Sequence, residues 1–157
     1  MARRTRYWLA GGALALAVLV GVGWWVFTTP RYRVPLPPAD ATPAQVAMAY
    51  MHALDADDRS TAEALSTPGY RSETDRWLRG TAALRRMKVT GSTAMTAADH
   101  WRLPGQPWTQ ETDVSVEFDY QQAWWDDDPS FVSGHHLWGY LLVRDGGRWL
   151  VNDCGTG

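Results

Sequence analysis

One carboxylate and two phenols are the groups of this chain best suited to acid–base chemistry. An isomerase-type enzyme needs an acid or base that projects into an apolar cavity, where desolvation raises the pKa of a carboxyl group. Asp153 follows Trp149 and Val151 in an inward register, and Tyr50 and Tyr140 lie in apolar segments. A carboxylate at a strand end is more often a hydrogen-bonding group, and a buried tyrosine is usually core. The sequence therefore favours a non-enzymatic domain and leaves catalysis by this trio as an alternative.

Two histidines and a single cysteine are the remaining reactive groups. His135 and His136 follow the acidic run 126–128, but neighbouring residues on a strand point to opposite faces, and no third ligand appears at a recognised spacing. Cys154 is the only cysteine, which excludes an intrachain disulfide. Asp153 beside it supplies an acid rather than the base that would lower the pKa of the thiol. We therefore predict no metal, no cofactor and a mostly buried thiol.

Tryptophan is abundant, with ten in 157 residues. Trp77, Trp138 and Trp149 lie in contexts typical of a core. Exposed aromatic side chains enrich binding surfaces, so tryptophans in or beside loops predict a ligand or partner site at one end of the domain. The alternative is that wide loops fold back and bury these rings. The predicted site consists of Trp101, Trp108, Trp124 and Trp125.

The longest uncharged stretch is Trp8–Phe27, with the sequence WLAGGALALAVLVGVGWWVF. As a helix it would reach about 30 Å, the thickness of the hydrocarbon core of a bilayer. Trp8, Trp24 and Trp25 mark its two ends, where aromatic rings favour the headgroup level. The run is long for a signal peptide and no A-x-A-like cleavage site follows it. The sequence thus predicts an uncleaved signal-anchor, a single-pass transmembrane helix in contact with the lipid bilayer.

Charge predicts the orientation and excludes one class of partner. Three arginines in the tail 1–7 precede the span and two follow it, which places the N-terminus in the cytoplasm and the C-terminal domain outside the plasma membrane. From Ala39 onward there are ten basic against seventeen acidic residues, which argues against nucleic acid. Ala13, Ala17 and Gly21 form a small-xxx-small face, so a homodimer or a partner membrane protein is a hypothesis.

The remaining chain predicts a proline-rich linker over 28–41 and a domain over 42–157. Thr42, Pro43 and Gln45 form a capping box that opens the first helix, and an acid among 55–58 caps the second. Ser72 caps a third helix that ends at Gly80. Strands are predicted over 88–97, 112–124, 136–143 and 149–154, with a hairpin turn at 145–147. Every acid of the second strand falls on the face opposite its inward residues, which are Val114, Val116, Phe118 and Tyr120.

Helices followed by an antiparallel, curved four-stranded sheet make an α+β fold. The chain resembles the nuclear-transport-factor-2-like superfamily, the cystatin-like α+β cone, over residues 42–157. The likeness is carried by Thr42-Pro43, by Leu54–Asp57 and by the stretch Gly147–Asp153. More closely, it is similar to the small membrane-anchored members common in actinobacteria. The resemblance implies a pocket between the first helix and the concave sheet, which some members use for catalysis and others for binding or assembly.

Function must be argued from such a pocket, because one fold hosts many activities. The leading prediction is a membrane-anchored extracytoplasmic, non-enzymatic domain that binds a partner protein or a small ligand. One alternative is a small pocket enzyme of the isomerase or dehydratase type that uses Asp153 with Tyr50 or Tyr140. The other is an assembly or scaffold domain of a membrane complex.

Overall fold

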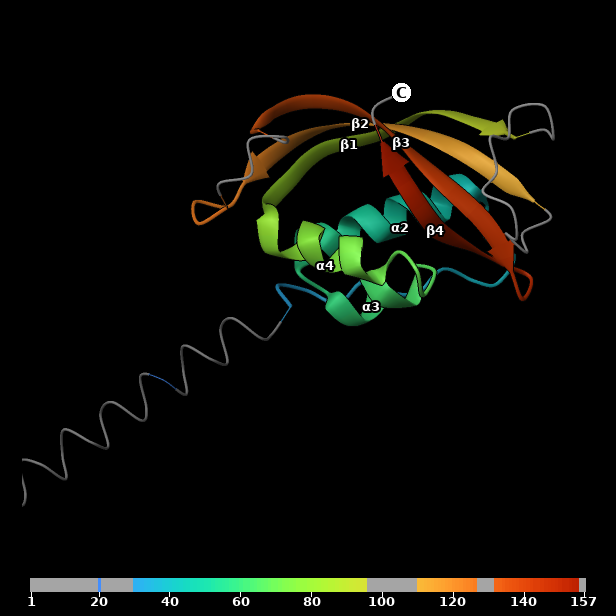
Figure 1. The fold of residues 1–157 in the computed structure, drawn as a ribbon, viewed down its shortest axis with the longest axis horizontal. Helices are drawn as coiled ribbons and strands as arrows, with labels where there is room; N and C mark the ends of the chain where they lie inside the picture. Colours follow the sequence, from blue (N-terminus) through green and yellow to red (C-terminus); the bar gives the residue numbers. More distant parts are fainter. Residues whose placement is uncertain (1–19, 21–29, 96–109, 127–131, 156–157) are drawn as a thin grey trace, which may run out of the picture. The chain divides into compact units, whose positions relative to one another are not determined.

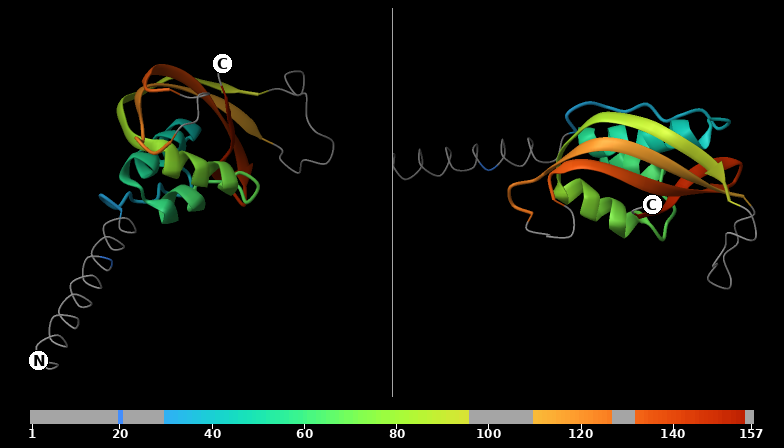
Figure 2. Two further views of the ribbon diagram at one scale, coloured as in Figure 1. Left: turned by 60° about the vertical axis from the view of Figure 1, so that its left-hand side comes forward. Right: turned by 90° about the horizontal axis from the view of Figure 1, so that it is seen from above.

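A computed structural model describes residues 30–95, 110–126 and 132–155, together with Val20. The chain divides into two compact units, Met1–Pro30 and Arg31–Gly157. The described residues of the second unit form three helices and four strands, in the order α2 (Pro43–Ala56), α3 (Arg59–Ala64), α4 (Arg71–Gly80), β1 (Thr81–Ala94), β2 (Glu111–Gln122), β3 (Gly134–Asp145) and β4 (Arg148–Gly155). The strands form one antiparallel sheet in the order β1-β2-β3-β4, which arches over the helices (Figures 1 and 2).

The predicted fold class is corrected in its first element, the transmembrane helix. Among the described residues no helix is long and apolar enough to cross a membrane. The longest, α2, has 14 residues, whereas about 20 are needed to span the hydrocarbon core. Of the predicted anchor 8–27 only Val20 is described, so Trp8, Trp24 and Trp25 lie outside the described residues. What the structure supports is an α+β domain with a four-stranded antiparallel sheet and helices.

The predictions that followed from the anchor are corrected with it. These are the membrane, signal-anchor and single-pass assignments, and the placement in the plasma membrane with a cytoplasmic N-terminus and an extracytoplasmic domain. They depended on the apolarity and length of one stretch, and the described helices are shorter and pack on a shared core. The lipid contact predicted for residues 8–27 lies outside the described residues.

The segment 31–41, expected as part of a linker, belongs to the compact unit Arg31–Gly157. Val34 is 9% exposed and belongs to the core. Its backbone N–H donates to Asp58 Oδ2 at 3.1 Å, and Thr61 Oγ1 donates to its carbonyl oxygen at 3.1 Å. Asp58 itself is 1% exposed. The buried carboxylate therefore ties this proline-rich segment to the start of α3.

The helix starts follow the sequence signals in two of three cases. Thr42 and Gln45 form the predicted capping box of α2 with Pro43 in its first turn. Asp58 caps α3 by accepting a hydrogen bond from the backbone N–H of Thr61, as expected for one of the acids in the junction. Ser72 does not cap α4, because that helix already begins at Arg71 and its N-cap position makes no side-chain cap bond.

The concave face of the sheet is built by alternate residues, as the pattern of β2 predicts. Val114, Val116 and Phe118 are fully buried and Tyr120 is 5% exposed. They pair with Tyr140, Trp138, His136 and Gly134 of β3, which place further rings on the same face. β1 begins at Thr81, seven residues before the predicted start, because α4 runs directly into it at Gly80.

A bulge in β4 changes which C-terminal side chains face inward. Val151 pairs with Leu142, and Asp153 pairs with Leu141, so Asn152 is an extra residue on β4. Cys154, which follows Asp153, lies opposite the inward Tyr140. An extra residue shifts the alternation of a strand by one. The predicted inward register of Asp153 with Val151 is therefore wrong, and its side chain is exposed.

The outer edge of β4 is partly covered by the loop between α3 and α4. The backbone N–H of Val151 donates to the carbonyl oxygen of Leu65 at 2.8 Å, and the N–H of Thr67 donates to the carbonyl oxygen of Val151 at 2.8 Å. Ser66 and Val151 thus form an isolated parallel bridge. This contact fixes the loop that leads into α4 against the last strand of the sheet.

Candidate functional site

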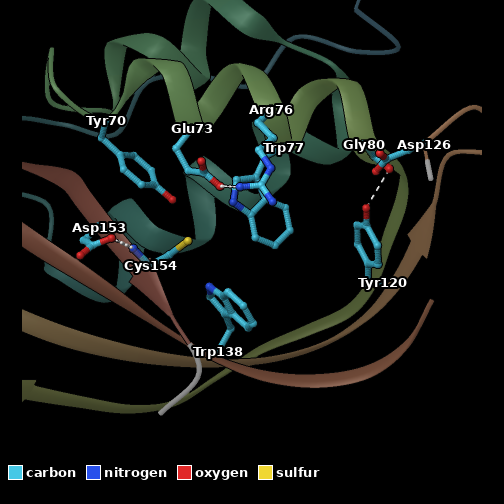
Figure 3. Close-up of a pocket in the computed structure, with 10 residues that line it drawn as sticks. All are labelled: Tyr70, Glu73, Arg76, Trp77, Gly80, Tyr120, Asp126, Trp138, Asp153 and Cys154. Carbon is cyan, nitrogen blue, oxygen red and sulfur yellow. Dashed lines mark hydrogen bonds and ion pairs between the residues drawn. The ribbon is translucent and has the colours of Figure 1, made fainter. Parts of the chain in front are cut away.

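A cavity of about 440 Å³ opens between α4 and the concave face of the sheet. Side chains of α4, β3 and β4 point into it from opposite sides (Figure 3). Four aromatic side chains and a half-buried thiol form the apolar part of its wall. The side chains that form this wall are Tyr70, Trp77, Tyr120, Trp138 and Cys154.

The aromatic rings are held at steep angles to one another. The ring centroids of Trp77 and Trp138 are 5.9 Å apart at an interplanar angle of 80°, and those of Trp77 and Tyr120 are 6.0 Å apart at 85°. Such edge-to-face pairs are favourable beyond the apolar area that they bury. Tyr120 Oη also donates to the carbonyl oxygen of Gly80 at 2.8 Å, which fixes the ring at the junction of α4 and β1. The wall is therefore preorganised.

Charged side chains lie at the same cavity. Glu73, Arg76, Asp126 and Asp153 all line it. Arg76 pairs with Glu73, one turn earlier on α4, at 3.5 Å. Asp153 Oδ1 accepts a hydrogen bond from the backbone N–H of Cys154 at 2.8 Å. Among the described lining residues three carboxylates thus face one guanidinium, and that guanidinium already has a carboxylate partner.

The phenol of Tyr70 and the thiol of Cys154 are held in their neutral forms. Burial raises the pKa of Tyr70 above its usual value, and the nearby Tyr50 adds to this effect. Burial also raises the pKa of the Cys154 thiol, and it outweighs hydrogen bonds to Tyr70, Trp138 and Trp77 that act in the opposite direction. A neutral thiol is a weak nucleophile. The wall is therefore suited to contact with a ligand rather than to nucleophilic attack.

The predicted catalytic trio is not brought together in the cavity. Tyr50 and Tyr140 are fully buried with ring centroids 5.8 Å apart, and neither belongs to the cavity wall. Tyr50 Oη shares a hydrogen bond with Thr74 Oγ1 at 3.1 Å, whereas Tyr140 Oη has no hydrogen-bond partner within the described part of the chain. Burial raises the pKa of both phenols. Asp153 lines the cavity but is exposed.

Half of the predicted tryptophan site can be located. Trp124 is 90% exposed and Trp125 is 55% exposed, with ring centroids 5.4 Å apart. Trp125 Nε1 donates to the carbonyl oxygen of Arg79 at 3.0 Å, which attaches this pair to the end of α4. Neither ring lines the cavity. Trp101 and Trp108 lie outside the described residues.

The two histidines point to opposite faces, as strand geometry predicts. His135 lies on the convex face, where Nδ1 and Nε2 are each 3.0 Å from a carboxylate oxygen, of Asp119 and Glu117 respectively. These hydrogen bonds raise the pKa of its imidazole. His136 lies on the concave face and stacks on Phe118. In the described ranges no group of three or more His, Cys, Asp or Glu side chains is arranged to hold a metal ion.

Most of the cavity residues could not be predicted from the sequence, because their contexts are typical of core residues or indicate no role. Trp77 and Trp138 have the apolar contexts of core residues, and the structure does pack them against the core. One signal was available on α4 and the N-cap residue that precedes it. Tyr70, Glu73 and Trp77 have the spacing of one helix face, where a carboxylate between two aromatic rings indicates a surface that is only partly closed.

No family model matches this chain, and no curated protein matches it. Among solved structures it is similar to the solution structure of a SEC-C motif containing protein from Rhodopseudomonas palustris. That similarity has a TM-score of 0.52 at 12% identity and covers 77% of this chain and 82% of the other. At this identity the similarity bears on the fold alone.

The comparison corrects the resemblance to the nuclear-transport-factor-2-like cone and its small actinobacterial members. The structural neighbour is a SEC-C motif containing protein with a different fold from that cone, and no family model supports the resemblance. The error has a physical reason. The motifs that suggested it are a helix cap, a helix junction and a hairpin turn, which many α+β domains need at the same kinds of position.

Proposed function

We propose that this domain binds a small organic ligand in the cavity between α4 and the sheet, without chemical turnover. The observation that carries the proposal is the cavity of about 440 Å³ with its aromatic wall. Known ligand pockets have volumes of roughly 300 to 1,000 Å³ and are lined by apolar and aromatic side chains with a few polar groups. The wall is also preorganised by its edge-to-face ring pairs, which lowers the entropic cost of binding.

The enzyme alternative receives less support from the same residues. Acid–base catalysis of the predicted kind needs a desolvated carboxyl group in the cavity. Asp153 is exposed, and Tyr50 and Tyr140 do not reach the cavity wall. Assembly through the domain, a homodimer and a partner protein stay predictions, since no second chain accompanies the structure.

Cys154 provides a direct test, because it is the only cysteine and it lines the cavity. The full chain is incubated with N-phenyl-1-naphthylamine, a neutral probe whose fluorescence rises in apolar surroundings. Cys154 is then alkylated with N-ethylmaleimide and the product is followed by intact mass. We expect one probe per chain to bind with enhanced fluorescence and to slow the alkylation.

A matched pair of variants keeps the test specific to the cavity. Cys154→Phe places a ring in the cavity and should abolish the fluorescence enhancement. Leu137→Phe adds a similar ring on the convex face, where Leu137 is 57% exposed, and should leave probe binding unchanged. Thermal unfolding followed by circular dichroism checks that both variants fold. Equal probe binding by the two variants, or alkylation of the unmodified chain at the same rate with and without probe, would refute the proposed function.

A further inference from the structure

We propose that the ligand of this cavity is a small organic cation, an ammonium group that carries apolar substituents. The inference rests on the proposed function, since it specifies the chemistry of the ligand at the same site. It is carried by two independent properties of the described lining residues, the arrangement of their rings and the sign of their charges.

Aromatic rings line the cavity from both the helix and the sheet. Trp77 lies on α4, whereas Trp138 and Tyr120 lie on the sheet, and both are close to perpendicular to Trp77. The labelled side chains of Trp77 and Trp138 approach each other across the cavity (Figure 3). The face of an aromatic ring attracts a cation within about 6 Å of its centroid, and tryptophan does so most strongly. Rings turned at right angles allow one ammonium group to contact two faces.

The charges favour the same sign of ligand. Among the described lining residues, Glu73, Asp126 and Asp153 contribute three carboxylates, against the one guanidinium of Arg76. The pairing of Arg76 with Glu73 at 3.5 Å reduces what that guanidinium offers to an anion. A cleft lined by one sign of charge concentrates ligands of the opposite sign. A carboxylate or phosphate ligand would therefore meet net repulsion at this cavity.

The apolar part of the wall defines the rest of the ligand. Cys154 and Tyr70 are neutral because burial raises the pKa of each, so they add no charge. A compact, fully hydrated cation needs several oxygen ligands at once to replace its water shell, and within the described residues no group of three or more His, Cys, Asp or Glu side chains is arranged to hold one. An ammonium group shielded by methyl or larger substituents loses less hydration and gains contact with the rings.

The test compares three probes that share a phenol ring and differ in the charge of a tetrahedral substituent. These are (3-hydroxyphenyl)trimethylammonium, 3-tert-butylphenol and 3-hydroxybenzenesulfonate. Protection of Cys154 from N-ethylmaleimide, read by intact mass over a range of probe concentrations, gives an apparent Kd for each. We expect the cation to bind about fivefold or more tighter than its neutral isostere, with the difference shrinking at high salt. The sulfonate should bind most weakly.

Variants assign the preference to the two features. Trp138→Leu removes one ring and should weaken binding of the cation by about 3- to 30-fold, with a smaller effect on the neutral isostere. Asp153→Asn keeps the oxygen that accepts from the Cys154 N–H and should weaken only the cation, by about 2- to 5-fold. Asp145→Asn removes the same charge at the β3–β4 turn and should change neither.

The outcomes separate the two proposals. If the neutral or anionic probe protects Cys154 as well as the cation does, the inference about charge is wrong while the proposed function stands. Equal losses in Asp153→Asn and Asp145→Asn would likewise overturn the inference. If none of these probes protects Cys154, and N-phenyl-1-naphthylamine does not either, the proposed function fails and the inference fails with it.

Discussion

Replacement of Asp58 with alanine removes a buried carboxylate that joins the segment 31–41 to the start of α3. The side chain is 1% exposed. It accepts hydrogen bonds from the backbone N–H groups of Val34 and Thr61 and from the hydroxyls of Ser60 and Thr61. It also pairs with Arg33 at 3.4 Å, but that guanidinium is 73% exposed, so this pair contributes little.

The cost of Asp58→Ala follows from these contacts. Loss of the α3 cap costs about 1 kcal/mol. The buried N–H of Val34 loses its partner, which costs about 1 to 3 kcal/mol. The hydroxyls of Ser60 and Thr61 can rotate toward other acceptors, so their loss of Asp58 adds nothing to the expected change in the free energy of unfolding. We therefore expect the free energy of unfolding to fall by about 2 to 4 kcal/mol, a large share of the 5 to 15 kcal/mol typical of a domain.

The assay is urea unfolding of the full chain, followed by tryptophan fluorescence and by circular dichroism. Asp57→Asn is the control. It removes one negative charge from the neighbouring exposed residue, and asparagine tolerates the left-handed backbone there, with φ 56°. We expect this control to change the free energy of unfolding by less than about 0.5 kcal/mol. A loss in Asp58→Ala no larger than in the control would refute the assigned role of Asp58.

The pH dependence of the same pair of proteins provides a second check. Burial acts to raise the pKa of Asp58, but hydrogen bonds from Val34, Ser60 and Thr61 outweigh it and lower the pKa below the ordinary value of 3.8. A lowered folded-state pKa contributes stability that is present above the unfolded value and is lost as the pH falls through the folded value. The difference between the unmodified chain and Asp58→Ala should therefore narrow below about pH 4. A difference that widens there would contradict the reasoning.

Three further predictions concern other parts of the domain. Hydrogen bonds to two carboxylates raise the pKa of His135 above 6.5. The unmodified chain should therefore be more stable than His135→Gln below about pH 6.5, and this difference in the free energy of unfolding should disappear as the pH rises through the folded-state pKa. Urea unfolding of both proteins from about pH 5 to 9 measures the difference. The β4 bulge predicts that Asp153→Cys in a Cys154→Ser background is alkylated about tenfold or more faster than Cys154 itself, and equal rates would disprove the observed register. Tyr140→Phe removes a buried hydroxyl that lacks a partner among the described residues and should leave the free energy of unfolding unchanged or raise it, whereas Tyr50→Phe should lower it by about 1 kcal/mol in the same urea assay.

Signals that act within a few residues were readable from the sequence, and signals that depend on partners far along the chain were not. The capping box of Thr42 and Gln45 and the turn at Gly146 and Gly147 are local, and both appear in the structure. The alternation of β2 identified its buried face. In contrast, the bulge at Asn152 arises from pairing with β3, which no local pattern reports.

The cavity was harder to predict than the fold for a related reason. Its wall joins Tyr70, at the N-cap position of α4, and Trp77 of α4 to Trp138 of β3 and Cys154 of β4. Their proximity depends on how the helix crosses the sheet. A tryptophan that contacts the core on one side and a cavity on the other has the same sequence context as one that is wholly buried. The trio of Asp153, Tyr50 and Tyr140 does not meet at the cavity, because Asp153 lies among its lining residues whereas Tyr50 and Tyr140 are fully buried in the core away from its wall.

The bridge between Ser66 and Val151 has a consequence for how copies of this domain meet. A free sheet edge is a template for strand addition, and intermolecular growth of that kind leads to aggregation. At β4 the backbone groups of Val151 are already bonded within the chain, so a second copy would first have to detach the loop that leads into α4. At the opposite edge, the pairing of β1 is interrupted by bulges, and the backbone of Arg86 is in the left-handed region. A regular incoming strand could not form continuous hydrogen bonds with such a backbone. Addition of a second copy to the sheet is thus opposed at both edges, by the bonded loop at β4 and by the irregular backbone of β1.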